Sequence, residues 1–268
     1  MTGYMALSDW NLALASVFVL IDAAISLTLG LGIHQRMLIA ALRMVVQLSL
    51  MGLVLTALFS AVSPLWTAVA AVGMVLFAGR EIAARQERPL AGLWSYGIGT
   101  GCMMTGALLV TVFALTTALR PIPWYDPKYA IPLLGMILGN AMTGIALGIQ
   151  GLTTGLVAQR AAVEAQLMLG ANRRTAMEPV IRLALRNALM PIINSMSVTG
   201  IVSLPGMMTG QILGGVAPAD AVKYQILIMF LIAGGTGIGA MAAVVAASHR
   251  LTDSRHRLRL DRLAPNRG

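Results

Sequence analysis

Polar side chains and a Pro-Gly pair interrupt an apolar stretch around residue 200. Proline removes a backbone hydrogen bond and the following glycine adds freedom, so we predict that a helix is kinked or broken at Pro205-Gly206. Broken helices at membrane depth commonly line a substrate cavity. The candidate transport path comprises Gln47, Asn140, Asn194, Ser197, Ser203, Pro205, Gly206, Met207, Met208 and Gln211.

These residues also have plainer interpretations. The amides and hydroxyls could bridge neighbouring helices instead of touching a substrate. Glycines at four-residue spacing could serve tight helix packing, namely Gly206, Gly210 and Gly214 and the pairs Gly135/Gly139, Gly144/Gly148, Gly97/Gly101 and Gly235/Gly239. The methionine thioethers are soft ligands that would suit Cu(I), but they also fill gaps in apolar cores. Asp22 is the one acidic residue expected in the middle of a span, where it is either functional or simply protonated or paired.

A second group of chemically active residues forms a charged island between residues 151 and 188. Gly151 and Gly155 are expected to weaken the end of the fifth span. Strong helix formers then run from Ala158 to Leu169, and Gly170 suits a helix end where positive φ is needed. Thr175 and Glu178 have the spacing of a capping box, so a second helix is predicted to begin at Thr175. Arg174, Glu178, Arg182 and Arg186 recur every fourth residue as one charged stripe with Glu178 ahead of Arg182, which predicts a helix-turn-helix on the cytoplasmic surface.

Two interpretations of this island remain. It could be an interfacial amphipathic segment that only contacts lipid headgroups. Alternatively, it docks a cytosolic partner, and the residues expected to make that contact are Glu164, Gly170, Arg173 and Arg174.

Composition decides the class of protein in which these groups operate. Hydrophobic residues make up 57% of the chain and charged residues 11%, whereas soluble domains carry about 25% charged residues. The chain is therefore a membrane protein, and hydropathy predicts an all-α polytopic bundle of about seven transmembrane helices. The expected spans are residues 10–33, 37–59, 65–78, 90–119, 130–150, 189–213 and 224–247.

Basic residues predict the orientation, because they stay in the cytoplasm when flanking segments insert. With the N-terminus outside, 16 of the 19 Lys and Arg residues fall on the inner side, including six arginines between Arg250 and Arg267. Only Arg120, Lys128 and Lys223 fall outside. The net charge of +9 thus indicates topology and anionic headgroups, and no nucleic acid is expected as a partner. A plasma (inner) membrane location with the C-terminus in the cytoplasm follows.

The chain is interpreted as one membrane domain over residues 1–268, with residues 151–188 as its cytoplasmic coupling segment. The spacing of Glu164-Ala165, Gly170 and Ile181-Arg-Leu183 resembles the EAA loop of ATP-binding-cassette (ABC) importer permeases, with Gln166 in place of the second alanine.

A closer resemblance lies in the sixth expected span. Residues 198–213 and 219–226 closely resemble the FetB permease family, the membrane subunits of a bacterial iron-export ABC transporter with plant relatives tied to aluminium tolerance. Residues 134–142, Leu169-Gly-Ala171, Arg43 and Gln47 look like the same family. The resemblance implies a homodimer of this chain that is powered by a separate cytosolic ABC ATPase.

The expected function is that of an exporter permease for a metal ion, with iron as the substrate that the resemblance implies. No Walker motif or catalytic dyad is present, so the chain is not expected to be an enzyme or to bind a cofactor, and ATP would act through the partner. The core offers one carboxylate and no histidine, so iron would pass weakly coordinated or chelated, or the cargo is different. An ion-coupled secondary transporter or channel and a non-transporting scaffold remain alternatives.

Overall fold

The computed structural model describes residues 8–253 and 255–265, so Arg267 lies outside the described residues. Over these ranges the chain is helical, with isolated bridges in place of β-strands, which confirms the all-α prediction. The long helices end in residues that turn the chain, such as Val62 and Arg120, which have positive φ. The helices are α1 (Asp9–Thr28), α2 (His34–Ala61), α3 (Pro64–Ala84), α4 (Trp94–Phe113), α5 (Pro127–Ala158), α6 (Arg160–Met168), α7 (Arg173–Val198), α8 (Gly206–Leu213) and α9 (Pro218–Arg250).

Six of these helices are long and apolar enough to cross a membrane, namely α1 to α5 and α9, with α4 extended by a π-helical turn over Ala114–Leu119. The sixth expected span, residues 189–213, is not one helix. The second half of α7 and the short α8 cover it, because the chain leaves the helix at Val198 and re-enters it at Gly206. Other spans are longer than expected, most of all α3, which continues to Ala84, α5, which continues to Ala158, and α9, which begins at Pro218.

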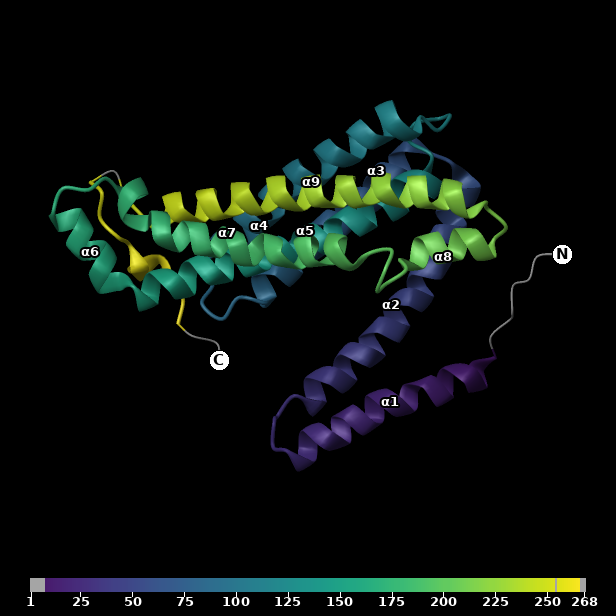
Figure 1. Cartoon of the computed structure of the whole chain (residues 1–268), viewed down its shortest axis with the longest axis horizontal. Coiled ribbons are helices and arrows are strands. Elements are labelled where there is room, and N and C mark those ends of the chain that lie inside the picture. The colour runs from purple at the N-terminus through teal and green to yellow at the C-terminus, as the bar shows by residue number, and fades with distance from the viewer. Residues whose placement is uncertain (1–7, 254, 266–268) are drawn as a thin grey trace.

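The helices form a bundle with one divergent arm (Figure 1). Helices α3, α4, α5, α7 and α9 pack together, and the most extensive contacts are those of α5 with α9 and α7 and of α4 with α9. In Figure 1, α7 runs between the ends of the bundle beside α9, and α6 lies across one end. Helices α1 and α2 pack mainly on each other and lean away from the rest. This arrangement connects the two ends of the bundle through α7 and α8.

A row of glycines on α5 lets α7 and α9 approach its backbone. A Cβ atom at Gly148 would lie 2.8 Å from the Val244 side chain of α9, and one at Gly155 would lie 2.7 Å from the Val180 side chain of α7. At Gly151 it would lie 3.3 Å from the Cα atom of Ala184. Glycine is therefore required along this face of α5 for the observed packing. Gly151 and Gly155, which were expected to weaken the end of the fifth span, instead extend it along α7.

The contact between α4 and α9 is closer still. A Cβ atom at Gly106 would lie 2.9 Å from the backbone oxygen of Gly235 and 3.2 Å from the Cα atom of Gly239. Backbone atoms cannot rotate away as a side chain can, so the helices would have to separate. The expected packing role of the Gly235/Gly239 pair is thus confirmed.

Other glycine pairs do not follow the packing prediction. A Cβ atom at Gly97, Gly101, Gly206 or Gly210 would have no neighbour within 4 Å among the residues outside its own helix turn. The spacing of four residues was the same in every pair, so spacing alone does not tell a packed glycine from one on an open face.

Gly106→Ala should destabilise the bundle by about 1–3 kcal/mol, because the added methyl group overpacks a backbone contact. Gly101→Ala on the same helix is the matched control, and it should be neutral or stabilise by up to about 1 kcal/mol through helix propensity. Unfolding of both purified variants in mixed micelles with increasing denaturing detergent measures the difference. Equal stability of the two variants would contradict the close packing of α4 on α9.

Candidate functional site

The turn between α6 and α7 is closed by a glycine with positive φ. Gly170 has φ +91°, which confirms the predicted role of this residue at a helix C-terminus. The Gly170 amide donates to the Leu167 carbonyl (3.1 Å) and the Ala171 amide donates to the Gln166 carbonyl (3.0 Å). This is the Schellman arrangement, which satisfies carbonyls that the helix end leaves free. The turn is therefore a defined structure and not a loose loop.

Helix α7 begins two residues earlier than expected. The Asn172 side chain accepts hydrogen bonds from the Thr175 amide (3.0 Å) and hydroxyl (3.2 Å). Asn172 is thus the N-cap, and the predicted start at Thr175 with a Glu178 capping box is wrong. Glu178 lies beyond the first turn, where it pairs with Arg182 as predicted.

The tip of the turn is apolar. Met168 and Leu169 are 82% and 88% exposed, and together with Gly170 they form the outermost part of the turn. Glu164 points along α6, where it pairs with Arg160 at 2.8 Å. The sequence analysis chose the charged residues of this segment and missed the two exposed apolar ones. Their position directly before a helix-ending glycine was the available signal.

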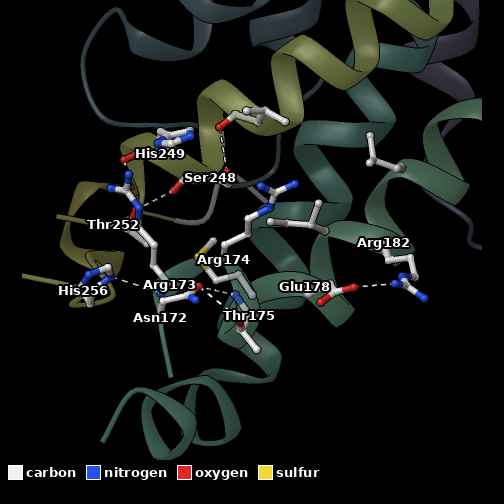
Figure 2. Close-up of a pocket in the computed structure, with 14 residues that line it drawn as sticks. Asn172, Arg173, Arg174, Thr175, Glu178, Arg182, Ser248, His249, Thr252 and His256 are labelled. Carbon is white, nitrogen blue, oxygen red and sulfur yellow. Dashed lines mark hydrogen bonds and ion pairs between the residues drawn. The ribbon is translucent and has the colours of Figure 1, made fainter. Parts of the chain in front are cut away.

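The C-terminal segment holds the α6–α7 turn in place (Figure 2). His256 Nδ1 accepts a hydrogen bond from the backbone amide of Arg173 (3.3 Å). The same segment is tied to the α3–α4 connection, because the Ala91 amide donates to the Arg262 carbonyl (2.7 Å) and the Ala264 amide donates to the Pro89 carbonyl (2.8 Å). Three parts of the chain that are distant in sequence therefore meet at this end of the bundle. Contacts of this kind have no local sequence signature.

Ion pairs stiffen this segment. The hydrogen bonds that Arg259 donates to the Asp261 carboxylate hold the pKa of Asp261 at about 2. Backbone and side-chain hydrogen bonds from Arg257 lower the pKa of Asp253. Both carboxylates thus stay charged at any physiological pH.

The break between α7 and α8 is an ordered loop. The Gly200 amide donates to the Ser203 carbonyl (2.8 Å) and the Ser203 amide donates to the Val198 carbonyl (3.2 Å), with Gly200 at φ +94°. Pro205 then serves as the N-cap of α8. The predicted interruption at Pro205-Gly206 is confirmed as a helix break, and it extends back to Thr199.

The loop leaves backbone oxygens free. The carbonyls of Thr199, Gly200, Ile201, Val202 and Leu204 accept no hydrogen bond from any described residue. The side chains of Ile201 and Val202 are 93% and 79% exposed, so two of the residues that carry these oxygens also expose apolar side chains. An unpaired carbonyl in such surroundings is costly unless a ligand, water or another chain reaches it. A cluster of this kind can solvate a cation by its dipoles.

The other candidate residues of the sixth expected span differ in their exposure. Ala184, Ala188 and Ile192 face the bundle, whereas Asn194 and Ser197 are exposed on the opposite face. Ser203 is exposed in the loop, and Gln211 of α8 keeps a buried side-chain oxygen without a partner among the described residues. Met207 and Met208 pack against the core, so neither stands free beside the break. Asn194, Ser197 and Ser203 are thus each uncovered in the single chain.

Two candidate residues lie elsewhere. Gln47 lines a groove of about 1010 Å³ between α2, α3 and α5, and Asn140 follows Gly139 of that groove while donating to the Met136 carbonyl (2.9 Å). Arg43 pairs with Glu81 and stacks over Phe77 in the same groove. None of the groove's lining residues comes from α7 or α8. Within one chain, Gln47 and Asn140 are therefore separate from the residues at the break. Asp22 is exposed on α1 in the divergent arm.

Metal-ligand clusters do not explain the site. Over residues 8–253 and 255–265, the chain has no group of three or more His, Cys, Asp or Glu side chains that could hold a metal ion. Any cation that enters the region of the break would meet neutral oxygen atoms.

Comparison with known proteins places this architecture in a family. Residues 9–252 match the profile described as "Uncharacterised protein family (UPF0014)". The chain belongs to the UPF0014 family. It is 36% identical over 229 residues to the UPF0014 membrane protein STAR2 of Oryza sativa subsp. japonica. The matched residues cover 85% of this chain and 78% of STAR2.

Other members of the UPF0014 family have names that refer to metals. The chain is 32% identical over 235 residues to Protein ALUMINUM SENSITIVE 3 of Arabidopsis thaliana, covering 86% of this chain and 82% of that protein. It is 29% identical over 254 residues to the Probable iron export permease protein FetB of Escherichia coli K12, covering 94% and 95% of the two chains. No solved structure matches this UPF0014 chain. The resemblance drawn from residues 198–226 is thus confirmed at the level of the family.

Proposed function

We propose that the chain is the membrane-spanning permease subunit of an ATP-driven ABC exporter. The observation that carries this proposal is the continuity of α7, which runs as one helix from the α6–α7 turn to the break at residue 199. A partner that moves the turn would move the break with it, because one continuous helix joins them. That helix is held along its length by packing on α5 and α9. Such a link is what an ATPase needs to drive a transport path at a distance.

The α6–α7 turn is the proposed contact with the ATPase. Its apolar tip at Met168 and Leu169 and its defined closure at Gly170 suit insertion into a cleft of a partner protein. Glu164, Arg173 and Arg174 flank that tip and would set the register of the contact. The geometry of the tip, and not charge alone, would then determine the fit.

A second copy of the chain is the proposed cover for the open face of α7. Asn194 and Ser197 are exposed. The Ser197 hydroxyl donates to the Ile193 carbonyl (2.9 Å) of its own helix, whereas the Asn194 amide forms no hydrogen bond with any described residue, and lipid could not satisfy it. The free carbonyls of the break lie next to them in sequence, and Gln47 is exposed on the α2 side. A homodimer would enclose these groups in one path between the two copies. This arrangement accounts for polar residues that a single chain leaves uncovered.

The proposed cargo is a metal ion, with iron as the candidate that the name of FetB suggests. Carbonyl, amide and hydroxyl oxygens at the break are hard ligands of the kind that such ions accept. An ion-coupled transporter or a scaffold would not need an ATPase at the turn, so the ATPase contact separates those alternatives from an exporter.

The proposed orientation places the α6–α7 turn and the C-terminus in the cytoplasm and the connection before α5 outside. Leu169→Cys and Lys128→Cys, each in a Cys102→Ala background, should react with membrane-impermeant maleimide from the inside and the outside, respectively. Both positions are exposed, so access depends on the side of the membrane. Labelling of residue 169 in intact cells would reverse the orientation.

Gly170→Val should abolish the pull-down of the ATPase, because a β-branched residue is strained at φ +91° and the turn would change shape. Gly215→Val is the matched control. It has φ +92° and the same open surroundings but lies between α8 and α9 at the other end of the bundle. Native mass spectrometry of the control complex should find two permease chains with two ATPase chains. Normal recovery of the ATPase with Gly170→Val would remove the turn from the interface.

Asn194→Ala should keep basal ATP hydrolysis but lower metal export about tenfold, the effect of losing one hydrogen bond to a charged cargo. Pro205→Ala should uncouple hydrolysis from export, because it restores a backbone donor at the break. Thr105→Ala, an exposed site on α4, is the control and should export normally. Metal efflux from reconstituted vesicles measures all three variants. Parent-level export by Asn194→Ala and Pro205→Ala would direct the search for the path to Asp22 and the α2 groove.

A further inference from the structure

A groove of about 880 Å³ lies between the first half of α7 and the last turns of α9 (Figure 2). This volume is within the roughly 300–1,000 Å³ range of ligand-binding pockets. Its residues on α7 recur at Arg174, Glu178, Ile181 and Leu185, and those on α9 at Val245, Ser248 and His249, with Thr252 just beyond the end of α9. Each set follows the helical repeat, so each helix presents one face to the groove.

The groove is cationic at one end and apolar at the other. Arg173, Arg174, His249 and His256 surround the end near the α6–α7 turn, whereas Ile181, Leu185 and Val245 form the walls farther along the helices. Arg174 and Leu185 are separated by about 16 Å along α7 at the usual helical rise. The charged end belongs to the side that carries most of the basic residues, and the apolar end points into the bundle's membrane-spanning region.

The charges of Arg173 and Arg174 are not neutralised by any described residue. Glu178 is the one acidic residue that lines the groove, and it pairs with Arg182. The guanidinium groups of Arg173 and Arg174 form no ion pair or hydrogen bond with any described residue. Figure 2 shows both side chains extending from the start of α7 toward α9, into the groove. Cations so placed favour a ligand that brings negative charge.

We propose that this groove binds an anionic phospholipid. The headgroup phosphate would lie between Arg173, Arg174 and His249, and an acyl chain would lie along Ile181, Leu185 and Val245. Charge at one end and apolar walls toward the membrane match the two parts of such a lipid, and basic pockets between helices at the cytoplasmic side are typical headgroup sites. An acidic protein surface would satisfy the arginines but would leave the apolar walls uncovered. The proposal does not depend on the ATPase or on the cargo.

The bound lipid would also stabilise the position of α7. It would bridge the α6–α7 turn and the end of α9, which the C-terminal segment already connects through His256 and Arg173. Occupancy would therefore favour the packed arrangement of α7 on α9.

The test uses the full-length purified chain without ATPase, titrated with phosphatidylglycerol or with phosphatidylcholine of the same acyl chains. Native mass spectrometry counts the retained lipid. Phosphatidylglycerol should be retained in preference, and Arg174→Gln should weaken its retention about fivefold, the effect of removing one basic residue near a headgroup. Arg186→Gln is the matched control, since Arg186 is exposed on the same helix but does not line the groove.

A second variant tests the apolar wall. Val245→Phe fills the groove from an exposed position on α9 without changing charge, so it should also lower phosphatidylglycerol retention. Equal retention of the two lipids, equal effects of Arg174→Gln and Arg186→Gln, or no effect of Val245→Phe would each overturn the proposal. If Arg174→Gln leaves lipid retention unchanged but abolishes ATPase pull-down, the groove is a protein-docking surface and the lipid proposal fails.

Discussion

The backbone contact that glycines allow between α5 and its neighbours is the constraint on which the rest of the structure depends. Lipid gives apolar helices no hydrophobic reason to associate, so their packing depends on van der Waals contact over closely approaching surfaces. Gly148, Gly151 and Gly155 provide such a surface on α5, and α7 and α9 occupy it. Because α7 carries arginines in its first half, its hydropathy is low for a membrane span. Its position therefore depends on packing against this surface of α5.

Seating α7 in this way makes it suitable for transmitting motion. Packed interfaces tend to switch between discrete arrangements instead of deforming continuously. Val180, Ala184 and Ala188 form the face of α7 that packs on the glycines of α5, so a shift of α7 would have to move to another arrangement of the same close contacts. One end of α7 is the closed turn at Gly170 and the other is the helix break at Thr199, so a movement of α7 would displace both. The C-terminal contact at His256 and the groove beside Arg174 lie at the Gly170 end of α7.

The sequence predicted features that depend on local chemistry. Gly170 with positive φ, the Glu178–Arg182 pair and the break at Pro205 each follow from residue type and near neighbours, and each is present. The predicted start of α7 was wrong because Asn172 and Thr175 are both good N-cap residues. Hydrogen-bond geometry, which the sequence does not contain, selected Asn172. The packing of Gly148 and the openness of Gly101 were indistinguishable, since both depend on which helix lies opposite. The candidate path was only partly assembled for the same reason: Gln47 and Asn194 belong to helices that one chain does not bring together.

If the cargo is a cation as proposed, the chemistry of the break would favour its release over its storage. Five carbonyls that accept no hydrogen bond from any described residue, with neighbouring amide and hydroxyl oxygens, would stabilise an ion by dipoles, whereas a cluster of carboxylates would hold it by opposite charge. Passage requires binding that is strong enough for entry and weak enough for exit. Neutral ligands on a loop at the end of a movable helix meet that requirement, because a small shift of α7 disperses the oxygens and lowers the affinity. In the proposed path, an external motor would act by changing the geometry of these ligands, and such a path would work without a resident metal site or a titrating acid at the break.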